Sequence, residues 1–241
     1  FRSFTHYIAI SDYARQLVRQ YHVRGKISVI PPGITDDLTT NSYTRNDLGR
    51  LLYRNVTNRI VFVTTGRLIA RKGHVWFIKN VMTRLPRTAL YAIAGDGPER
   101  DRISMLIKFL KIEDRIIMLG RVSHTDKKIL LNTADVFIQP NIPVTGDAEG
   151  FGIAPIEAAL CERKVFASNI DGIPSAIHNG KNGTLLPPKE TTAWVNALIK
   201  FMEHPLSQEP SGKDARAYTL AEFSWDVIAK KYQDVFSDAV Q

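Results

Sequence analysis

The sequence predicts an α/β fold in which helices cover both faces of a doubly wound parallel sheet. Short apolar runs alternate with segments of helical periodicity along almost all of the 241 residues. The apolar runs are hydrophobic at both odd and even positions, as expected for strands covered on both faces. Strand and helix in steady succession favour parallel strands joined by right-handed crossovers.

The predicted elements follow one another in a regular order. The short apolar runs predict strands at Tyr7–Ile10, Ile27–Ile30, Ile60–Thr64, Leu90–Ala94, Ile116–Leu119, Val136–Gln139, Lys164–Ala167 and Gly183–Leu186. Helical spacing predicts helices at Tyr13–Tyr21, His74–Arg84, Glu99–Leu110, Thr125–Leu131, Ile153–Leu160, Thr191–Met202, Ala215–Glu222 and Ser224–Ala239. The polar stretch Thr35–Asn58 predicts an excursion with a short helix near Arg45–Tyr53, and Pro205–Lys213 predicts a loop rich in Pro and Ser.

Composition is that of an ordinary globular protein, with 44% hydrophobic and 23% charged residues. Lys plus Arg number 32 against 24 for Asp plus Glu, an excess of 8 that favours phosphates, nucleic acid or an acidic membrane face as partners. The single cysteine, Cys161, lies in an apolar run, where we expect it to be buried, and it favours a reducing compartment. No apolar stretch approaches the ~18 residues of a membrane span, and no signal peptide is visible. We therefore expect a cytoplasmic protein, with peripheral contact at an anionic inner membrane face left open.

Chemistry is expected where the strands end, because ligands of such sheets bind beyond the carboxyl ends of the strands. After the strand Ile60–Thr64, the segment Gly66–Gly73 offers a tight glycine exit, the cations Arg67 and Lys72, and the start of a helix. A helix N-terminus favours anions and the cations add full charges, so this segment predicts a diphosphate site. A solvated basic loop is the alternative, and the Gly-Lys-Ser/Thr order of a Walker loop is absent.

Two further strand ends are rich in glycine. Gly95–Pro98 leads from a strand into a helix, and its glycines allow either a well-made turn or close approach of a ligand. It is not a dinucleotide-binding fingerprint, because Arg100 stands where that pattern has glycine. In Gly120–Val122 exposed main chain is expected to border a base, and Ser123 is a plausible cap of the following helix.

The most informative strand end runs from Gln139 to Glu157. A loop rich in Pro, Gly and Asn leads into Gly150–Gly152, whose amides are expected to be unpaired at the mouth of the site. Glu149 and Glu157 flank this turn. Phosphates would repel both carboxylates, so sugar or ribose hydroxyls are their expected partners, at ~1.5–3 kcal/mol for a charged hydrogen bond. The alternative is that Glu149 only complements the helix dipole and Glu157 is incidental.

At this point the sequence resembles a known family. The run from Glu149 to Glu157, Glu-Gly-Phe-Gly-Ile-Ala-Pro-Ile-Glu, is similar to the Glu-x7-Glu signature of glycosyltransferase family 4, retaining enzymes of the two-domain GT-B fold. The other matching segments, in the family's order, are Ile8–Ser11, Ile30–Gly33, Gly66–Gly73, Gly95–Pro98, Gly120–Arg121 and Phe223–Trp225. The resemblance covers nearly the whole chain. It implies the carboxy-terminal, Rossmann-like half of a GT-B enzyme, which binds the nucleotide sugar.

The resemblance implies roles residue by residue. Arg67 and Lys72 would stabilise the leaving diphosphate and Glu149 would hold a donor-sugar hydroxyl, so these three are the expected catalytic residues. The nucleotide sugar would also contact Gly66, Arg121, Val122, Gly150, Phe151, Gly152 and Glu157. Among these, Glu157 would take the ribose hydroxyls. The implied donor is a UDP-, GDP- or ADP-sugar, with no metal and no cofactor, because cations and helix N-termini neutralise the charge.

The resemblance also implies two parts of the chain and a missing partner. Residues 1–33 would be the tail of an amino-terminal acceptor domain with the interdomain linker, and residues 34–241 the donor domain. The rest of the acceptor domain usually supplies a histidine near the reacting carbon, and His6 is not expected to replace it. Since the sequence starts at Phe1 rather than Met, a fragment of a longer protein is one expectation. The acceptor would be a glycan or a lipid-linked saccharide.

Two places depart from the family pattern. Glu162 and Lys164 stand where Gly and Pro are usual, which concerns only a helix-to-strand turn. Ser175 replaces a frequent Glu and removes a contact at the edge of the site, so the geometry around the donor is expected to differ.

Other functions remain as alternatives. A non-catalytic module that binds nucleotide or sugar would use the same residues. A nicotinamide-dependent oxidoreductase lacks its glycine fingerprint. A glycosidase is disfavoured because Glu149 and Glu157 lie on one contiguous segment, where flanking a scissile bond from opposite sides is awkward. Nucleic acid is not an expected partner, because the sequence has no aromatic-basic platform.

Overall fold

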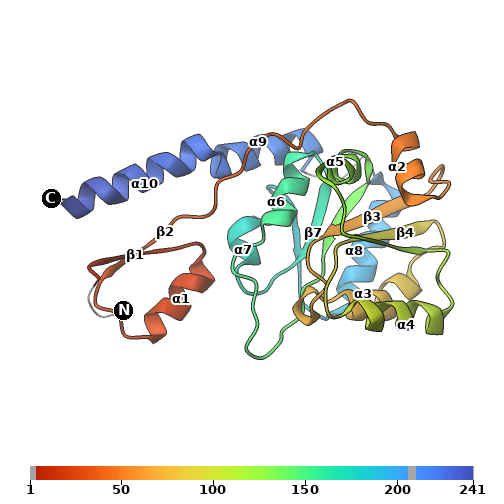
Figure 1. Ribbon diagram of the computed structural model, residues 1–241, viewed down its shortest axis with the longest axis horizontal. Coiled ribbons are helices and arrows are strands. Elements are labelled where there is room, and N and C mark those ends of the chain that lie inside the picture. The colour runs from red at the N-terminus through yellow and green to blue at the C-terminus, as the bar shows by residue number, and fades with distance from the viewer. Residues whose placement is uncertain (1–3, 206–209, 241) are drawn as a thin grey trace.

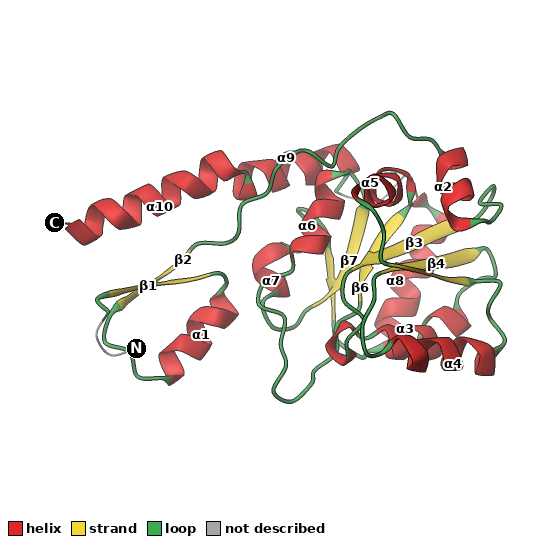
Figure 2. Ribbon diagram, viewed as in Figure 1, coloured by secondary structure: helices red, strands yellow, loops and turns green. Residues whose placement is uncertain are grey.

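A six-stranded parallel sheet forms the centre of the computed structural model, which describes residues 4–205 and 210–240 (Figures 1 and 2). Its strands are β3 (Ile60–Thr65), β4 (Ala89–Ala94), β5 (Ile116–Gly120), β6 (Val136–Gln139), β7 (Lys164–Ser168) and β8 (Thr184–Leu186). Their order is β5-β4-β3-β6-β7-β8, with every neighbouring pair parallel. The sheet grows outwards from β3 in one direction and from β6 in the other. The predicted fold class is confirmed, and the carboxyl ends of β3 and β6 form the switch point where such folds bind ligands.

Helices cover both faces of this sheet (Figure 2). The described helices are α1 (Asp12–Gln20), α2 (Arg45–Leu52), α3 (His74–Asn80), α4 (Arg100–Leu110), α5 (His124–Thr133), α6 (Ile153–Leu160), α7 (Ile173–Ala176), α8 (Thr191–Glu203), α9 (Gly212–Phe223) and α10 (Trp225–Val240), with 3-10 turns η1 (Ala70–Lys72) and η2 (Met82–Arg84). Of these, α1 and α10 lie away from the main sheet (Figure 1). Alternate residues of β3 serve opposite faces: Val61 and Val63 pack with α2, α5, α6 and α9, whereas Phe62 packs with α3, α4 and α8. Both cores are therefore built on the same strands, which holds the strand ends rigidly in place.

A second, two-stranded parallel sheet lies outside the main one. It consists of β1 (His6–Ala9) and β2 (Lys26–Val29), joined by α1. Helix α10 runs back beside it (Figure 1), where Lys26 Nζ donates a hydrogen bond to Asp238 at 3.1 Å. The linker passes the start of α10 so closely that a Cβ on Gly33 would lie 2.4 Å from the Trp225 ring. The two sheets fall on either side of the predicted division at residue 33, which itself stays a prediction.

Three helical segments differ from their predictions. The predicted helix His74–Arg84 ends at Asn80 and is followed by the 3-10 turn η2, beyond which Pro86 prevents further helix. Helix α9 begins at Gly212, inside the predicted loop Pro205–Lys213, because Ser211 caps it by accepting a hydrogen bond from the Asp214 amide. Residues 206–209 of that loop lie outside the described residues. The four-residue helix α7 was not predicted at all, since it is too short for periodicity to reveal.

Two smaller expectations can be compared with the structure. Cys161 is buried as predicted, and burial raises the pKa of its thiol to about 11. Within residues 4–205 and 210–240, none of the helices combines the length and the hydrophobicity that crossing a bilayer requires.

Candidate functional site

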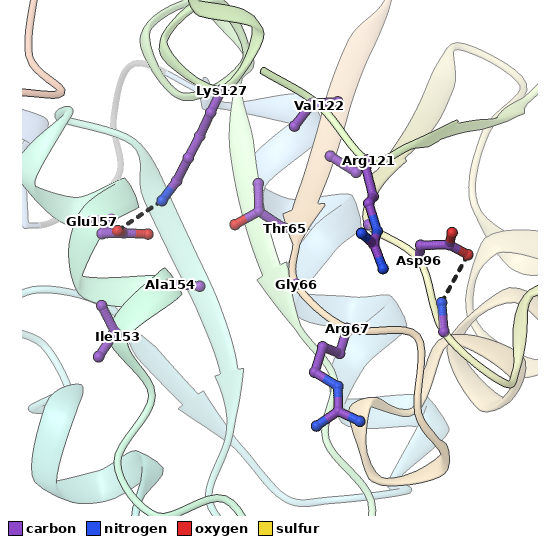
Figure 3. A pocket seen from close by; sticks show the side chains of 13 residues that line it. Thr65, Gly66, Arg67, Asp96, Arg121, Val122, Lys127, Ile153, Ala154 and Glu157 are labelled. Carbon is purple, nitrogen blue, oxygen red and sulfur yellow. Dashed lines mark hydrogen bonds and ion pairs between the residues drawn. The ribbon is translucent and has the colours of Figure 1, made fainter. Parts of the chain in front are cut away.

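A cavity of about 830 Å³ opens at the carboxyl edge of the main sheet, beyond the ends of β3, β4 and β5 (Figure 3). Helices α5 and α6 form its opposite wall. The lining residues are Thr65, Gly66, Arg67, Ala94, Gly95, Asp96, Gly97, Arg121, Val122, Lys127, Ile153, Ala154 and Glu157. Five of the predicted site residues are therefore brought to one cavity: Gly66, Arg67, Arg121, Val122 and Glu157.

Glycines let the first two strand ends pack against each other. A Cβ on Gly95 would lie 1.7 Å from the carbonyl oxygen of Gly66, and one on Gly97 would lie 2.5 Å from that of Leu68. Both glycines also have positive φ angles, of 156° and 158°. The two turns thus pack closely, which fixes the backbone from which Arg67 projects. Gly95 and Gly97 also line the cavity, so close approach of a ligand at this strand end stays a prediction.

Two arginines lie on this side of the cavity. Arg67 follows β3, Arg121 follows β5, and both side chains are exposed (Figure 3). Neither guanidinium group forms a hydrogen bond or an ion pair with any residue in 4–205 and 210–240. Unpaired guanidinium groups are well suited to bind an anion such as a diphosphate, because they offer several donors in a planar fork.

Glu149 lies next to this cavity and is held by several donors at once. Its Oε2 accepts hydrogen bonds from Arg71 Nη1 and Lys72 Nζ, both at 2.6 Å, and from Asn141 Nδ2 at 3.2 Å. Arg71 also donates through Nε to Asp147 at 2.9 Å. We call these five residues the Glu149 cluster. All of these bonds reach one oxygen of Glu149, so its Oε1 has no partner within the described part of the chain and can accept from a ligand hydroxyl.

Nearby positive charges favour the ionised form of Glu149 despite its burial. Burial alone would raise the pKa of Glu149, but the charges of Lys72 and Arg71 and the hydrogen bonds from Lys72 and Asn141 lower it below its usual value. The pKa of Lys72 is also lowered, because burial outweighs the attraction of Glu149. His74, the next side chain inward, is fully buried, and burial together with the charge of Lys72 lowers its pKa to about 3. Its ring nitrogen instead shares a 3.0 Å hydrogen bond with the Tyr91 hydroxyl.

The Glu149 cluster adjoins the cavity through Lys72. The Lys72 ammonium is 4.0 Å from the position that a Cβ on Gly66 would occupy, and Gly66 lines the cavity. Lys72 therefore lies near the same strand end as Arg67 but does not line the cavity, and its ammonium is bound to Glu149.

The Gly150–Gly152 turn differs in part from its prediction. Its amides have no hydrogen-bond partner among the residues that the structure describes, as expected. However, none of the three residues lines the cavity, which is instead bordered by the next two residues, Ile153 and Ala154. The Phe151 ring is 3% exposed and packs edge-on against Phe223, so its side chain is a core residue that anchors the turn. Gly150 faces away towards α1, close to the Ile10 side chain.

Glu157 lies on the α6 wall of the cavity and is paired with Lys127 of α5 (Figure 3). Lys127 Nζ donates to Glu157 Oε1 at 2.7 Å, which leaves Oε2 without a partner in the described chain. Both carboxylates of the predicted pair thus have one oxygen bound to a lysine and the other available.

Comparison with known proteins identifies the family. A sequence profile described as "Glycosyl transferases group 1" matches residues 53–218, more than half of the chain. The chain belongs to the group 1 glycosyltransferases. Whether it belongs to family 4 in particular stays a prediction.

Relatives and solved structures agree with this assignment. The chain is 24% identical over 183 residues to the alpha-D-kanosaminyltransferase of Streptomyces kanamyceticus, covering 75% of this chain and 46% of that protein. It is 26% identical over 234 residues to a GDP-mannose-dependent phosphatidylinositol monomannoside mannosyltransferase of Mycolicibacterium smegmatis, covering 95% and 61%. Anabaena HepE, solved in complex with UDP and glucose, superposes with a TM-score of 0.83 at 24% identity, covering 97% and 63%. The chain thus spans about half the length of such relatives, and its fold is that of one half of a GT-B glycosyltransferase.

Three side chains at the candidate site, Arg71, Asn141 and Lys127, were not predicted from the sequence. Arg71 was visible as a third cation beside Lys72, but nothing in the sequence shows that it points at Glu149. Asn141 and Lys127 gave no signal, because their contacts join residues on different elements. No group of three or more His, Cys, Asp or Glu side chains suited to a metal ion occurs within 4–205 and 210–240.

Proposed function

We propose that the chain is the donor-binding part of a retaining glycosyltransferase that uses a nucleoside-diphosphate sugar. The observation that carries this proposal is the division of charge around the cavity: Arg67 and Arg121 are unpaired, whereas Glu149 and Glu157 are paired with lysines. A diphosphate matches the arginines, and hydroxyl groups match the free carboxylate oxygens. The complex of HepE with UDP and glucose, a protein of the same fold, supports this choice of ligand.

The diphosphate would lie between Arg67 and the first turn of α6. The Ile153 and Ala154 residues of that turn line the cavity, and helix amides favour anions. Lys72 would complete the cradle once the sugar engages Glu149. Arg67, Arg121, Lys72 and the N-terminus of α6 would then stabilise the charge of the leaving group without a metal ion or a cofactor. A UDP-, GDP- or ADP-sugar would satisfy this arrangement.

Transfer would proceed on one face of the donor sugar. The acceptor hydroxyl oxygen forms a bond to the anomeric carbon while the bond from that carbon to the diphosphate oxygen breaks. The bonding electron pair leaves with the nucleoside diphosphate, beside Arg67 and Lys72, and the hydroxyl proton passes to the departing phosphate oxygen. Glu149 Oε1 would orient the sugar by accepting a hydrogen bond from one of its hydroxyls.

The remaining parts of the proposal concern the whole enzyme. We infer an amino-terminal acceptor domain as the partner of this chain, and a glycan or lipid-linked saccharide as the acceptor, as in polysaccharide biosynthesis. A cytoplasmic location with peripheral contact at an anionic membrane completes the proposal.

Calorimetric titration with UDP, GDP and ADP, followed by a donor-hydrolysis assay with the matching nucleotide glucose or mannose, tests it. We expect one nucleotide to bind and its sugar to be hydrolysed slowly. Binding without any turnover of the donor would favour a non-catalytic module, and absence of binding by all three nucleotides would contradict the proposal.

A further inference from the structure

Lys127 has no role in the proposed transfer, yet its side chain lines the cavity. It extends from α5 across one end of the cavity to reach Glu157 on α6 (Figure 3). The Nζ–Oε1 distance is 2.7 Å, and the two side chains are 27% and 19% exposed. The pair therefore forms part of the binding surface rather than of the outer surface.

An ordinary surface ion pair differs from this one in exposure. Arg87 and Asp114 also form an ion pair, at 3.4 Å, but their side chains are 83% and 55% exposed. Exposed pairs of that kind contribute little, because water screens them and long side chains lose entropy. A pair that lies partly out of water is screened less, so Lys127 has a stronger hold on the orientation of Glu157.

Lys127 also compensates the negative charge of Glu157 in the cavity. An uncompensated carboxylate in a cavity that takes a diphosphate would repel the ligand. Lys127 neutralises Glu157 while occupying only Oε1, so Oε2 remains an acceptor for a hydroxyl. An ammonium carries three donors, and only one is used by Glu157, which leaves the others for a ligand oxygen.

We propose that Lys127 is a positioning residue that makes the site selective for the ribose of the donor nucleotide. It holds Glu157 with Oε2 directed at the ribose hydroxyl pair, and a second ammonium hydrogen donates to the same hydroxyls. This inference rests on the proposed function, because it requires that a nucleotide fills the cavity.

Comparison of a nucleoside diphosphate with its 2′-deoxy form tests this role. Titrations would use UDP, GDP or ADP, whichever binds the unaltered chain best, and the corresponding 2′-deoxynucleotide. In Lys127→Met we expect affinity for the ribonucleotide to fall about tenfold, the size of one charged hydrogen bond. Affinity for the deoxynucleotide should fall only about twofold. That loss reflects the uncompensated charge of Glu157 near the diphosphate, because the hydroxyl that Lys127 and Glu157 recognise is already absent.

Two further variants control for indirect effects. Lys128→Met removes the neighbouring lysine of α5, which does not line the cavity, and should leave both affinities unchanged. Lys127→Arg keeps a donor and a positive charge, and should restore most of the preference for ribose. Thermal unfolding of each variant shows whether it is folded.

The outcomes separate this inference from the proposed function. Equal losses of affinity for both nucleotides in Lys127→Met would mean that the lysine only neutralises Glu157 or ties α5 to α6, and would overturn the inference. Unchanged affinity for the ribonucleotide would overturn it as well. Failure of the unaltered chain to bind any of the three nucleotides would instead reject the proposed function, and the ribose site with it.

Discussion

The two carboxylates of the site are held very differently. Glu149 accepts hydrogen bonds on one oxygen from two cations and from Asn141, and its side chain is 13% exposed. Glu157 has one partner among the described residues, Lys127, across the open cavity. Glu149 is therefore fixed by donors from several elements, whereas Glu157 is oriented by Lys127. This contrast matches a division between a place for chemistry, where fixed geometry matters most, and a place for nucleotide recognition.

Replacement of the two glutamates should give the largest contrast. We expect Glu149→Ala to lower sugar transfer by roughly 10²–10³-fold, because a preorganised contact to the sugar is lost. Its affinity for the nucleoside diphosphate should change little, since Glu149 contacts the sugar and its removal frees Lys72 for the phosphates. Glu157→Ala should mainly weaken nucleotide binding. Steady-state assays measure the transfer rates, and calorimetric titration measures the nucleotide affinities. A loss of nucleotide affinity in Glu149→Ala as large as that in Glu157→Ala would contradict the role assigned to Glu149.

Folding stability should divide the two residues in the same way. Removing Glu149 leaves Lys72 and Arg71 partly buried without their shared partner, which we expect to cost roughly 3 kcal/mol of unfolding free energy. Removing Glu157 should cost less than about 1 kcal/mol, because its surroundings open to the cavity. Urea denaturation of Glu149→Ala and Glu157→Ala checks this, with Glu149→Gln as an isosteric control. Equal losses of unfolding free energy in Glu149→Ala and Glu157→Ala would show that the Glu149 cluster stabilises the fold no more than the Glu157–Lys127 pair does.

Replacement of Arg67 tests the side of the cavity that carries Arg67 and Arg121, which we call the cationic wall. Arg67→Ala should weaken diphosphate binding by about 1.5–3 kcal/mol, the range for a charged hydrogen bond. Arg102→Ala, on α4, serves as the control, because neither Arg102 nor its partner Glu99 lines the cavity. An unchanged dissociation constant in Arg67→Ala would remove this residue from the site.

His74 should make the Glu149 end of the molecule sensitive to mild acid. Its pKa is about 3 in the folded state and about 6.5 when unfolded, so the unfolded chain binds the extra proton below pH 6.5. Its stability contribution is complete above pH 6.5 and declines as the pH falls, by about 1.4 kcal/mol per unit. Urea denaturation at pH 7, 6 and 5 should show this decline in the unaltered chain and a flatter profile in His74→Gln. The same dependence of unfolding free energy on pH in the unaltered chain and in His74→Gln would exclude His74 as the source of the decline.

Main-chain features of the site could be predicted from the sequence better than side-chain contacts. Strand ends fix where Gly66, Arg67, Arg121 and Val122 lie, because the carboxyl ends of parallel strands share one edge. The helix that carries Glu157 follows from periodicity. The pairing of Lys127 with Glu157 depends on how α5 packs against α6, and the orientation of Arg71 depends on the loop that precedes α6. The Phe151 ring shows the same limit: its place in the turn was predicted, but its burial against Phe223 required the tertiary structure.

The central claim is that the cationic wall binds a diphosphate. Titration of the best-binding nucleoside diphosphate and of its parent nucleoside, into the unaltered chain and into an Arg67→Ala, Arg121→Ala double variant, tests it most directly. We predict that the diphosphate binds the unaltered chain at least about tenfold more tightly than the nucleoside, and that this advantage disappears in the double variant. An advantage that is absent from the unaltered chain, or that survives both substitutions, would contradict the account.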